Sequence, residues 1–437
     1  MSKYNILATS FLGKPIDRKA SYVIIGGGIA GLFMGYCLKQ LGVKFEIIEN
    51  EKKAGGILGS QKIAQGTVEQ AANGFLWSPA MQALCDGLGL DILPPKATAN
   101  ARYLVRNKQL RKFPLTVLES LAAVSKLWVA PKQPMETIYD FGIEYLGTAM
   151  ANQLLEPAFA GIYGADIKKL SFPGALTPLA KILNQSDNLP WALWKHRRAQ
   201  KKNTVSTKGK AKRGTHSFKN GMGELVTRLT EYLSSEIVYG QNGLDWKSSK
   251  EQLILCTPAY VSQQFFDENT DLAQSLGAVS YTPIVSVSLI FKKSQLKSFK
   301  PGFGCLIPRS EGLNILGTLF NSCIFDHRVA HEELLSLTCI IRDDSSDLHY
   351  FQQTDAEITN WVVEELDQLF GISGAPESAT IFKWPKGIPL YSPQLYNSWF
   401  AWDRSLKENY PMRNLFGNYT GEISIRGMCE TMMAMLP

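Results

Sequence analysis

Residues 22–31 read Tyr22-Val23-Ile24-Ile25-Gly26-Gly27-Gly28-Ile29-Ala30-Gly31. An apolar run typical of a buried strand enters a turn with the pattern G-x-G-x-x-G, and residues 32–41 continue with apolar side chains at helical spacing. Residues 44–49 then return to strand character and end at Glu49. The stretch therefore predicts a βαβ unit of the Rossmann type, which binds a dinucleotide.

The glycines and the terminal carboxylate each have a physical role in this prediction. Gly26 allows the tight turn, Gly28 lets a diphosphate approach the main chain, and Gly31 brings helix and strand close together. The N-terminus of the helix supplies amide groups and positive potential to the phosphates. Glu49 is placed to accept hydrogen bonds from a ribose diol. These features indicate a dinucleotide but do not separate FAD from NAD.

Composition restricts the class of protein. A chain of 437 residues, 45% hydrophobic and 19% charged, is expected to fold into two or three globular modules. The seven cysteines form no C-x-x-C pair and the five histidines show no ligand spacing, so neither a disulfide framework nor a metal site is expected. We see no apolar run of signal-peptide length near the start and no uncharged run of about 18 residues. The expected location is cytoplasmic.

A basic segment carries much of the net charge of +7. It contains no acidic residue and includes Lys195, Arg197, Arg198, Lys201, Lys202, Lys208, Lys210, Lys212 and Arg213. The simplest interpretation is a solvated loop, and the alternative is a segment that attracts anionic lipid or an acidic partner. Nucleic acid is not an expected partner, because no stacking aromatic residues are interleaved with the basic ones.

The rest of the chain divides into a helical part and a strand-rich part. Residues 115–183 show helical patterns punctuated by prolines, and within them the amphipathic segment 115–129 is expected to be a buried or surface-lying helix. A multistranded sheet is expected later in the chain. The predicted elements are a hairpin at 103–110, helices at 80–88, 223–233 and 357–370, strands at 252–257, 284–291, 304–307, 314–320 and 336–341, and a final strand and helix within 415–435.

The continuation of the first motif carries a family resemblance. Residues 49–56 read Glu49-Asn50-Glu51-Lys52-Lys53-Ala54-Gly55-Gly56 and resemble the E-x-x-x-R-x-G-G signature of the amine oxidase and protoporphyrinogen oxidase superfamily of flavoenzymes. In that superfamily the basic residue and the paired glycines lie along the diphosphate and ribityl chain of FAD. Here Lys53 replaces the arginine, which keeps the charge but loses the bidentate geometry. The resemblance makes FAD the expected cofactor.

Further blocks resemble the protoporphyrinogen oxidase family and follow in the order of that family. They lie at 101–105 with 110–114, 156–166 with 170–171, 216–222, 302–308, 315–325 and 415–431. Three departures stand out: Ala71-Ala72 replaces Gly-Pro, Asn220 replaces a glycine, and Glu422 stands where a small residue is usual. The chain is identified as a divergent member of the family, similar to it over nearly its whole length.

The resemblance implies a fold and a division of the chain. The expected fold class is α/β, with a Rossmann-type FAD-binding domain, a mixed-sheet substrate domain and a mainly helical insertion. The FAD-binding domain is expected from residues 20–90, 213–260 and 405–437, the substrate domain from 91–112 and 261–404, and the helical, membrane-associating domain from 113–212.

The resemblance also implies site residues. The cofactor-binding residues that it implies are Gly26, Gly28, Ile29, Ala30, Gly31, Glu49, Asn50, Lys53, Gly55, Gly56, Ile57, Val238, Thr257, Gly417 and Ile425. On the substrate side it implies Arg102 for a propionate, because a guanidinium matches a carboxylate, together with Gly161, Leu306 and Phe325. Leu306 and Phe325 match positions that face the macrocycle, and a place in the core explains them equally well. No catalytic base is assigned, because the cofactor carries the difficult step.

The implied activity is FAD-dependent oxidation of protoporphyrinogen IX to protoporphyrin IX in haem biosynthesis, by successive hydride transfers to flavin with dioxygen as acceptor. Three alternatives stay open: a coproporphyrinogen III oxidase, another amine oxidase-like flavin oxidoreductase, and a non-catalytic protein that binds flavin or tetrapyrrole. Lys108, Arg111, Lys112 and Arg309 are the cations that could meet the extra propionates of coproporphyrinogen. Expected partners are the porphyrinogen, dioxygen, peripherally the cytoplasmic membrane, and ferrochelatase or a second copy of the chain.

Overall fold

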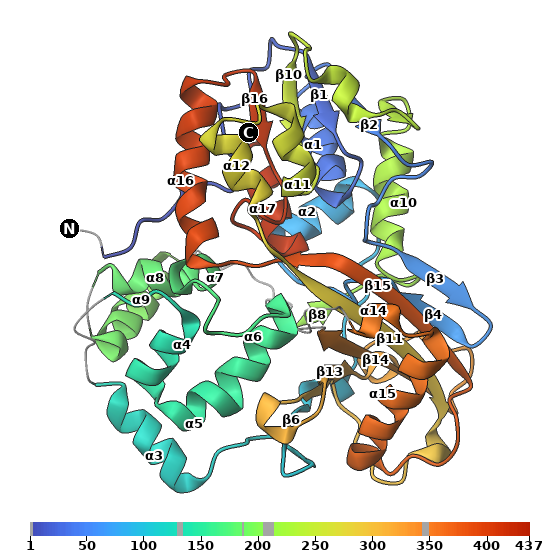
Figure 1. Cartoon of the computed structure of the whole chain (residues 1–437). Helices are drawn as coiled ribbons and strands as arrows, with labels where there is room; N and C mark the ends of the chain where they lie inside the picture. Colours follow the sequence, from blue (N-terminus) through green and yellow to red (C-terminus); the bar gives the residue numbers. More distant parts are fainter. Residues whose placement is uncertain (1–2, 129–133, 186–187, 204–213, 343–348) are drawn as a thin grey trace.

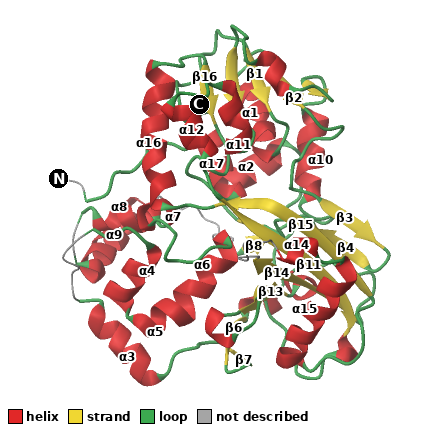
Figure 2. Cartoon of the chain, viewed as in Figure 1, coloured by secondary structure: helices red, strands yellow, loops and turns green. Residues whose placement is uncertain are grey.

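The computed structural model describes residues 3–128, 134–185, 188–203, 214–342 and 349–437. These residues form three modules that meet at a common centre (Figure 1). One module holds a parallel sheet, the second holds a mixed sheet, and the third is built from helices (Figure 2). The arrangement confirms the predicted α/β fold class.

A five-stranded parallel sheet contains the strand that enters the glycine turn. Its strand order is β16-β10-β1-β2-β9, and each neighbouring pair runs parallel. The strands are β1 (Tyr22–Ile25), β2 (Phe45–Glu49), β9 (Ile237–Tyr239), β10 (Gln252–Leu255) and β16 (Arg413–Leu415). Three distant parts of the chain therefore meet in one sheet, and all five strands end at the same edge.

Alternate residues of β1 point to opposite faces of this sheet and join two different cores. Ile24 packs with α1, α2, α10 and α17, whereas Val23 and Ile25 pack with α12 and α16. The bounds of these helices are α1 (Ile29–Gln40), α2 (Pro79–Gly87), α10 (Gly223–Tyr232), α12 (Asp271–Gly277), α16 (Pro393–Glu408) and α17 (Ile425–Met433). Helix α12 and most of α16 lie inside the range 261–404 of the predicted substrate domain, yet their apolar side chains pack on the five-stranded sheet.

The mixed sheet has seven strands in the order β15-β11-β14-β13-β12-β6-β7. The long strand β11 (Tyr281–Lys292) pairs antiparallel with both neighbours, whereas β6 runs parallel to β12. Asn107 and Lys108 have φ of 54° and 57°, which gives the β6–β7 turn the backbone that a tight hairpin favours. The other strands are β6 (Arg102–Arg106), β7 (Gln109–Arg111), β12 (Gly304–Leu306), β13 (Ile315–Leu319), β14 (Leu334–Arg342) and β15 (Ser378–Pro389).

The remaining elements complete the two sheet modules. α15 (Asp355–Phe370) packs on the mixed sheet through Ile358, Val362 and Leu366. Two small hairpins are formed by β3 (Ser60–Ile63) with β4 (Gly66–Glu69), and by β5 (Phe75–Leu76) with β8 (Thr215–His216). Three further short helices are α11 (Ala259–Ser262), α13 (Asn321–Ile324) and α14 (His349–Gln352).

The helical module lies at the lower left of Figure 1. Its core contains Phe141, Tyr145 and Phe172, and it is continuous with the core of the parallel sheet through Tyr391 and Trp399. Its helices are α3 (Val117–Lys126), α4 (Ile138–Phe141), α5 (Thr148–Met150), α6 (Glu156–Tyr163), α7 (Phe172–Ala175), α8 (Thr177–Leu183) and α9 (Leu189–Asn203). None of the helices within the described ranges is long and apolar enough to cross a bilayer.

The structure corrects the interpretation of the first part of the basic segment, up to residue 203, as a solvated loop. Its first part belongs to α9, because Leu189 and Ala192 are buried at the start of this helix and anchor it beside α8. The helix then continues through Lys195 to Asn203. Lys208, Lys210, Lys212 and Arg213 lie outside the described residues.

Candidate cofactor and substrate site

The glycine turn has the geometry that a diphosphate requires. A Cβ on Gly31 would lie 1.9 Å from the carbonyl oxygen of Gly26, so only glycine lets α1 approach β1 this closely. Gly26 itself has φ of 101°, which disfavours other residues. A Cβ on Gly28 would meet nothing within 4 Å, and no side chain caps the N-terminus of α1 there. Open space therefore faces the first amide groups of the helix.

The second glycine pair lies against the first. Gly55 N donates a hydrogen bond to Gly27 O at 2.8 Å, and Gly28 and Gly55 form a β-bridge. A Cβ on Gly56 would lie 3.4 Å from Gly28 Cα. Two motifs that the sequence separates thus form one strip of main chain without side chains. Ile29 and Ala30 continue this strip into α1, while Lys53 and Ile57 are exposed on the adjoining loop.

Glu49 lies at the end of β2 beside this strip. Its carboxylate accepts hydrogen bonds from Gly27 N and from Glu51 N, each at 2.8 Å. The neighbouring strand β9 brings Val238 next to Ile48. The carboxylate is thereby fixed at the edge of the sheet, with exposed Asn50 next to it in the chain, in the position that a ribose-binding acid needs.

The later cofactor candidates reach the same edge through sheet pairing. Cys256 N donates to Ile25 O at 2.9 Å, and Phe416 N donates to Leu255 O at 3.1 Å. Thr257 therefore lies beside the glycine turn, and a Cβ on Gly26 would be 3.0 Å from its Cγ2. Gly417 follows β16, and Ile425 is the first residue of α17. The carboxyl ends of parallel strands are where α/β proteins bind nucleotides.

Two of the predicted substrate residues meet across the boundary between modules. A Cβ on Gly161 of α6 would lie 2.9 Å from Leu306 Cδ2 on β12. Arg102 is paired with Gly304 on the neighbouring strand, so Arg102 and Leu306 are on the same face of the mixed sheet. The Arg102 guanidinium lies 4.5 Å from the centre of the Phe303 ring and is exposed.

Phe325 occupies a different environment. Its side chain is buried in a small core cluster with Ala99 and Ile324. The guanidinium of Arg328 lies 5.1 Å from the centre of its ring. Of the two interpretations open for Phe325, the structure shows the core position, and contact with a macrocycle stays a prediction.

Most of the other cations near Arg102 already have partners. Arg309 Nε lies 3.2 Å from the buried carboxylate of Glu156 on α6. Lys108 donates through its Nζ to Glu311 O and through its main-chain N to the Glu311 carboxylate. Arg111 and Lys112 are exposed on the hairpin. Arg102 is thus an exposed cation on the same face of the mixed sheet as Leu306.

A buried ion pair behind this region was not predicted from the sequence. Glu69 and Arg328 are each 1% exposed, and their side chains approach to 3.6 Å. Glu69 accepts from the Ser60 hydroxyl and from Met222 N, while Arg328 donates to Phe218 O and Ser217 Oγ. Burial raises the pKa of Glu69 to about 7, partly offset by Ser60 and Arg328. The pair links three segments, β4, 217–222 and 325–330.

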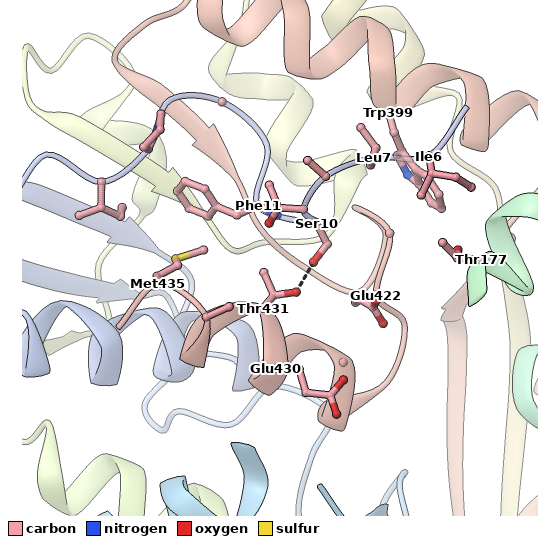
Figure 3. Close-up of a pocket in the computed structure, with 18 of the residues that line it drawn as sticks. Ile6, Leu7, Ser10, Phe11, Thr177, Trp399, Glu422, Glu430, Thr431 and Met435 are labelled. Atoms are coloured by element: carbon pink, nitrogen blue, oxygen red, sulfur yellow. Dashed lines mark hydrogen bonds between the residues drawn. The ribbon is translucent and has the colours of Figure 1, made fainter. Parts of the chain in front are cut away.

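A groove of about 680 Å³ lies elsewhere, between the N-terminal segment and helices α8, α16 and α17 (Figure 3). Ser10 Oγ and Thr431 Oγ1 share a hydrogen bond of 2.8 Å across it. Glu422 and Trp399 line it, and none of the predicted cofactor or substrate residues does. The groove is therefore distinct from the strip of glycines.

Comparison with protein families identifies the chain. The model of the family "Flavin containing amine oxidoreductase" matches residues 29–425. The chain belongs to this family. FAD is therefore its cofactor, and the glycine strip, the fixed Glu49 carboxylate and the uncapped N-terminus of α1 fit that group. The predicted membership and cofactor are confirmed, and contact of each named residue with FAD stays a prediction.

Relatives that the chain matches over most of its length include porphyrinogen oxidases. The chain is 26% identical over 461 residues to mitochondrial protoporphyrinogen oxidase of Nicotiana tabacum, covering 92% of this chain and 91% of the relative. It is 21% identical to coproporphyrinogen III oxidase of Bacillus subtilis (strain 168), covering 86% and 88%. These identities make it a divergent member that is related to both kinds of oxidase.

Solved structures show the same fold. An Exiguobacterium sp. 255-15 protein, provisionally assigned as a protoporphyrinogen oxidase, superimposes with a TM-score of 0.75 at 17% identity, over 96% of this chain and 98% of that one. Reduced UDP-galactopyranose mutase gives a TM-score of 0.70 at 13% identity, with 95% of each chain covered. The architecture is therefore shared by enzymes of different chemistry, and the fold alone does not assign a substrate.

Proposed function

We propose that the protein oxidises protoporphyrinogen IX to protoporphyrin IX by successive hydride transfers, with dioxygen as the final acceptor. The observation that carries the proposal is the meeting of Gly161 with Leu306, on the sheet face that also holds Arg102. A porphyrinogen is an apolar macrocycle with carboxylate arms, so its site needs apolar walls and a cation. Leu306 supplies a wall, and the missing side chain of Gly161 lets α6 pack closely against it.

The residues of this chain bind and orient, while FAD supplies the hydride acceptor when it is bound. Arg102 holds a propionate by charge-assisted hydrogen bonds and thereby fixes the rotation of the macrocycle. Leu306 excludes water from the carbon that loses hydride. The stacking of the Arg102 guanidinium on Phe303 limits its motion before substrate binds.

The pairing of the other cations supports protoporphyrinogen over coproporphyrinogen III, the second candidate. Coproporphyrinogen carries four propionates, and each buried carboxylate needs a partner. Arg309 is paired with the Glu156 carboxylate, and the Lys108 ammonium donates to the main-chain carbonyl of Glu311, so both cations already have partners. A substrate with two propionates needs fewer cationic partners than one with four, and Arg102 can supply one of them.

The test supplies each porphyrinogen to the flavin-loaded protein and follows porphyrin fluorescence. We expect faster oxidation of protoporphyrinogen, and Arg102→Met should raise its KM about ten- to hundredfold through the lost ion pair. Arg111→Met on the same hairpin is the matched control and should change little. Preference for coproporphyrinogen would favour the second candidate.

Anaerobic mixing separates an enzyme from a carrier. Bleaching of the flavin by protoporphyrinogen in a stopped-flow instrument is expected for an oxidase. A flavin that stays oxidised with both porphyrinogens would overturn the proposal. Reduction by an amine instead would indicate another chemistry of the same family.

We also propose that α3 brings the protein to an anionic membrane surface at the cytoplasmic side. The exposed apolar side chains of α3 and of the residues beside it are between 55% and 78% accessible and comprise Phe113, Val117, Leu118, Leu121, Val124 and Trp128. The acidic residue of α3, Glu119, is turned away and bonded to Arg106 at 2.8 and 3.0 Å. That hydrogen bond lowers the pKa of Glu119 to about 2. The apolar face therefore carries no acid that would repel anionic lipid.

Helix α9 carries a second set of features that suit a membrane surface. Trp191 and Trp194 are exposed and stacked 4.8 Å apart, and the Arg198 guanidinium lies over the Trp194 ring. Tryptophan next to basic residues is typical of a membrane–water interface.

Sedimentation with phosphatidylcholine vesicles that contain phosphatidylserine tests this contact. Binding should be strong at low salt, weaker at high salt, and reduced by Leu118→Glu. Asn360→Glu, on the exposed side of α15, is the matched control. Recovery in the supernatant at low salt would refute membrane contact, and concentration-dependent dimers abolished by Leu118→Glu would assign the face to a second copy instead.

A further inference from the structure

The turn that closes the cofactor edge receives two buried hydrogen bonds from outside its own segment. Tyr391 OH donates to Asn418 O at 2.7 Å, and Trp399 Nε1 donates to Tyr419 O at 2.7 Å. Tyr391 is 1% exposed and Trp399 is 3% exposed. Each carbonyl is thus satisfied by a donor that solvent does not replace.

The position of this turn matters because it joins β16 to α17. Gly417 begins it, and Gly421 ends it with φ of 127°. Within the turn, Thr420 bonds back to Gly417, so its internal bonds do not tie it to the rest of the molecule. The external donors therefore help to fix where the turn, and with it the N-terminus of α17, lies relative to the glycine strip.

The side chain of Tyr419 connects the turn to the cofactor edge itself. Its hydroxyl donates to Ser262 Oγ at 3.0 Å, and Ser262 Oγ shares a hydrogen bond of 2.9 Å with Thr257 Oγ1. Thr257 is one of the residues beside Gly26. A displacement of the turn would consequently disturb the side of the sheet edge opposite Glu49.

Both donors are themselves held rigidly. The Tyr391 ring lies 5.2 Å from that of Trp399 and 5.5 Å from that of Tyr163 on α6. Tyr391 O accepts from Ser171 N at 2.6 Å, at the start of α7. Trp399 belongs to α16 and also lines the groove in Figure 3, where it lies beside Leu7. The two donors thus fix the position of the turn relative to the helical module.

We infer that Tyr391 and Trp399 are positioning residues for FAD. They hold residues 417–421 in the shape in which the main chain of the turn meets the cofactor. They act through the turn and touch no reacting atom. The inference rests on the flavin cofactor and is independent of which substrate is oxidised.

FAD affinity of the apoprotein is the direct test, measured by quenching of flavin fluorescence. Tyr391→Phe removes one hydroxyl and leaves Asn418 O without its donor, so the dissociation constant for FAD should rise about tenfold. Trp399→Phe should have an effect of similar size through Tyr419 O. Tyr396→Phe, also on α16, is the matched control, because its hydroxyl donates to Asn5 O of the N-terminal segment and not to the turn.

Thermal unfolding of the apoproteins distinguishes a loss of FAD positioning from a general loss of stability. If a variant loses FAD affinity at a temperature where its apoprotein is fully folded, the positioning role is supported. Unchanged FAD affinity in both variants, whatever their melting temperatures, would overturn it. A further outcome is that the variants bind FAD weakly while their remaining flavin-loaded fraction keeps the normal preference between porphyrinogens. That result would support the positioning role and leave the proposed oxidase function unchanged, so the two proposals can fail separately.

Discussion

Replacement of Arg328 by methionine tests the buried ion pair most directly. The side chain is 1% exposed and donates to Ser217 Oγ at 2.7 Å and to Phe218 O at 3.2 Å, with Glu69 at 3.6 Å. Methionine fills much of the volume but removes every donor. Breaking one side of a buried pair costs roughly 3–5 kcal/mol, because the remaining charge is left in the interior.

The matched control is Arg228→Met on α10. Arg228 also forms an ion pair, with Glu231 at 3.2 Å, but the two side chains are 47% and 59% exposed. Solvent screening reduces such a pair to about 0.5 kcal/mol or less. The same substitution is therefore expected to have very different effects at the two sites.

Urea unfolding of the apoprotein at pH 8, followed by tryptophan fluorescence and circular dichroism, measures the difference. The midpoint of Arg328→Met should fall far below that of Arg228→Met with an unchanged slope. The double variant with Glu69→Gln should be less destabilised than the sum of the single changes. Equal midpoints for the two arginine variants would refute the reasoning that the pair stabilises the junction of β4, 217–222 and 325–330.

Three further predictions concern pH and the cofactor. Because burial raises the pKa of Glu69 to about 7, the native state binds the carboxyl proton more tightly than the unfolded state does. The free energy of unfolding, compared with that of Glu69→Gln, should therefore be highest below about pH 4.5 and should fall by about 3 kcal/mol as the pH rises through 7. A difference between the two proteins that does not change with pH would contradict this. Gly31→Ala should abolish flavin retention, since its Cβ would lie 1.9 Å from Gly26 O. A purified variant whose flavin absorbance at about 450 nm equals that of the wild type would show that α1 and β1 do not need to approach so closely. Lys53→Arg should tighten FAD binding a fewfold by restoring the bidentate fork, which titration of the apoprotein would detect.

The part of the fold that depends on local patterns was predictable. The β1–turn–α1 unit follows from an apolar run, a glycine turn and helical spacing, and its bounds differ from the prediction by a few residues. The hairpin at 103–110 follows from a polar tip that adopts positive φ. In these cases each element is specified by neighbours in the chain.

Other parts depend on partners that the sequence places far away. The strand Ser378–Pro389 and the helix Pro393–Glu408 were not predicted, although the aromatic run from Tyr391 to Trp402 was a readable signal of a buried helix. No local sequence pattern indicates that Glu69 is buried with an ionic partner. Its pairing with Arg328 requires the meeting of β4 with the loop after α13, which no local pattern specifies.

The candidate site was predictable where motifs carry it and not where packing completes it. Gly26, Gly28, Gly31 and Glu49 lie together as their spacing indicated. Tyr391 and Trp399 hold main-chain carbonyls, and such bonds leave no motif because the acceptor is common to every residue.

The assembly of the parallel sheet from residues 22–49, 237–255 and 413–415 sets an order of events during synthesis. A ribosome releases β1 and the glycine turn early, but the strand and helix that complete the edge emerge hundreds of residues later, on the order of tens of seconds at ordinary elongation rates. A nascent chain therefore has no finished nucleotide pocket until translation is nearly over. A chain that is terminated before β16 cannot complete the nucleotide pocket and so remains without its flavin. Quality-control proteases then act on a polypeptide that has no bound cofactor to stabilise it.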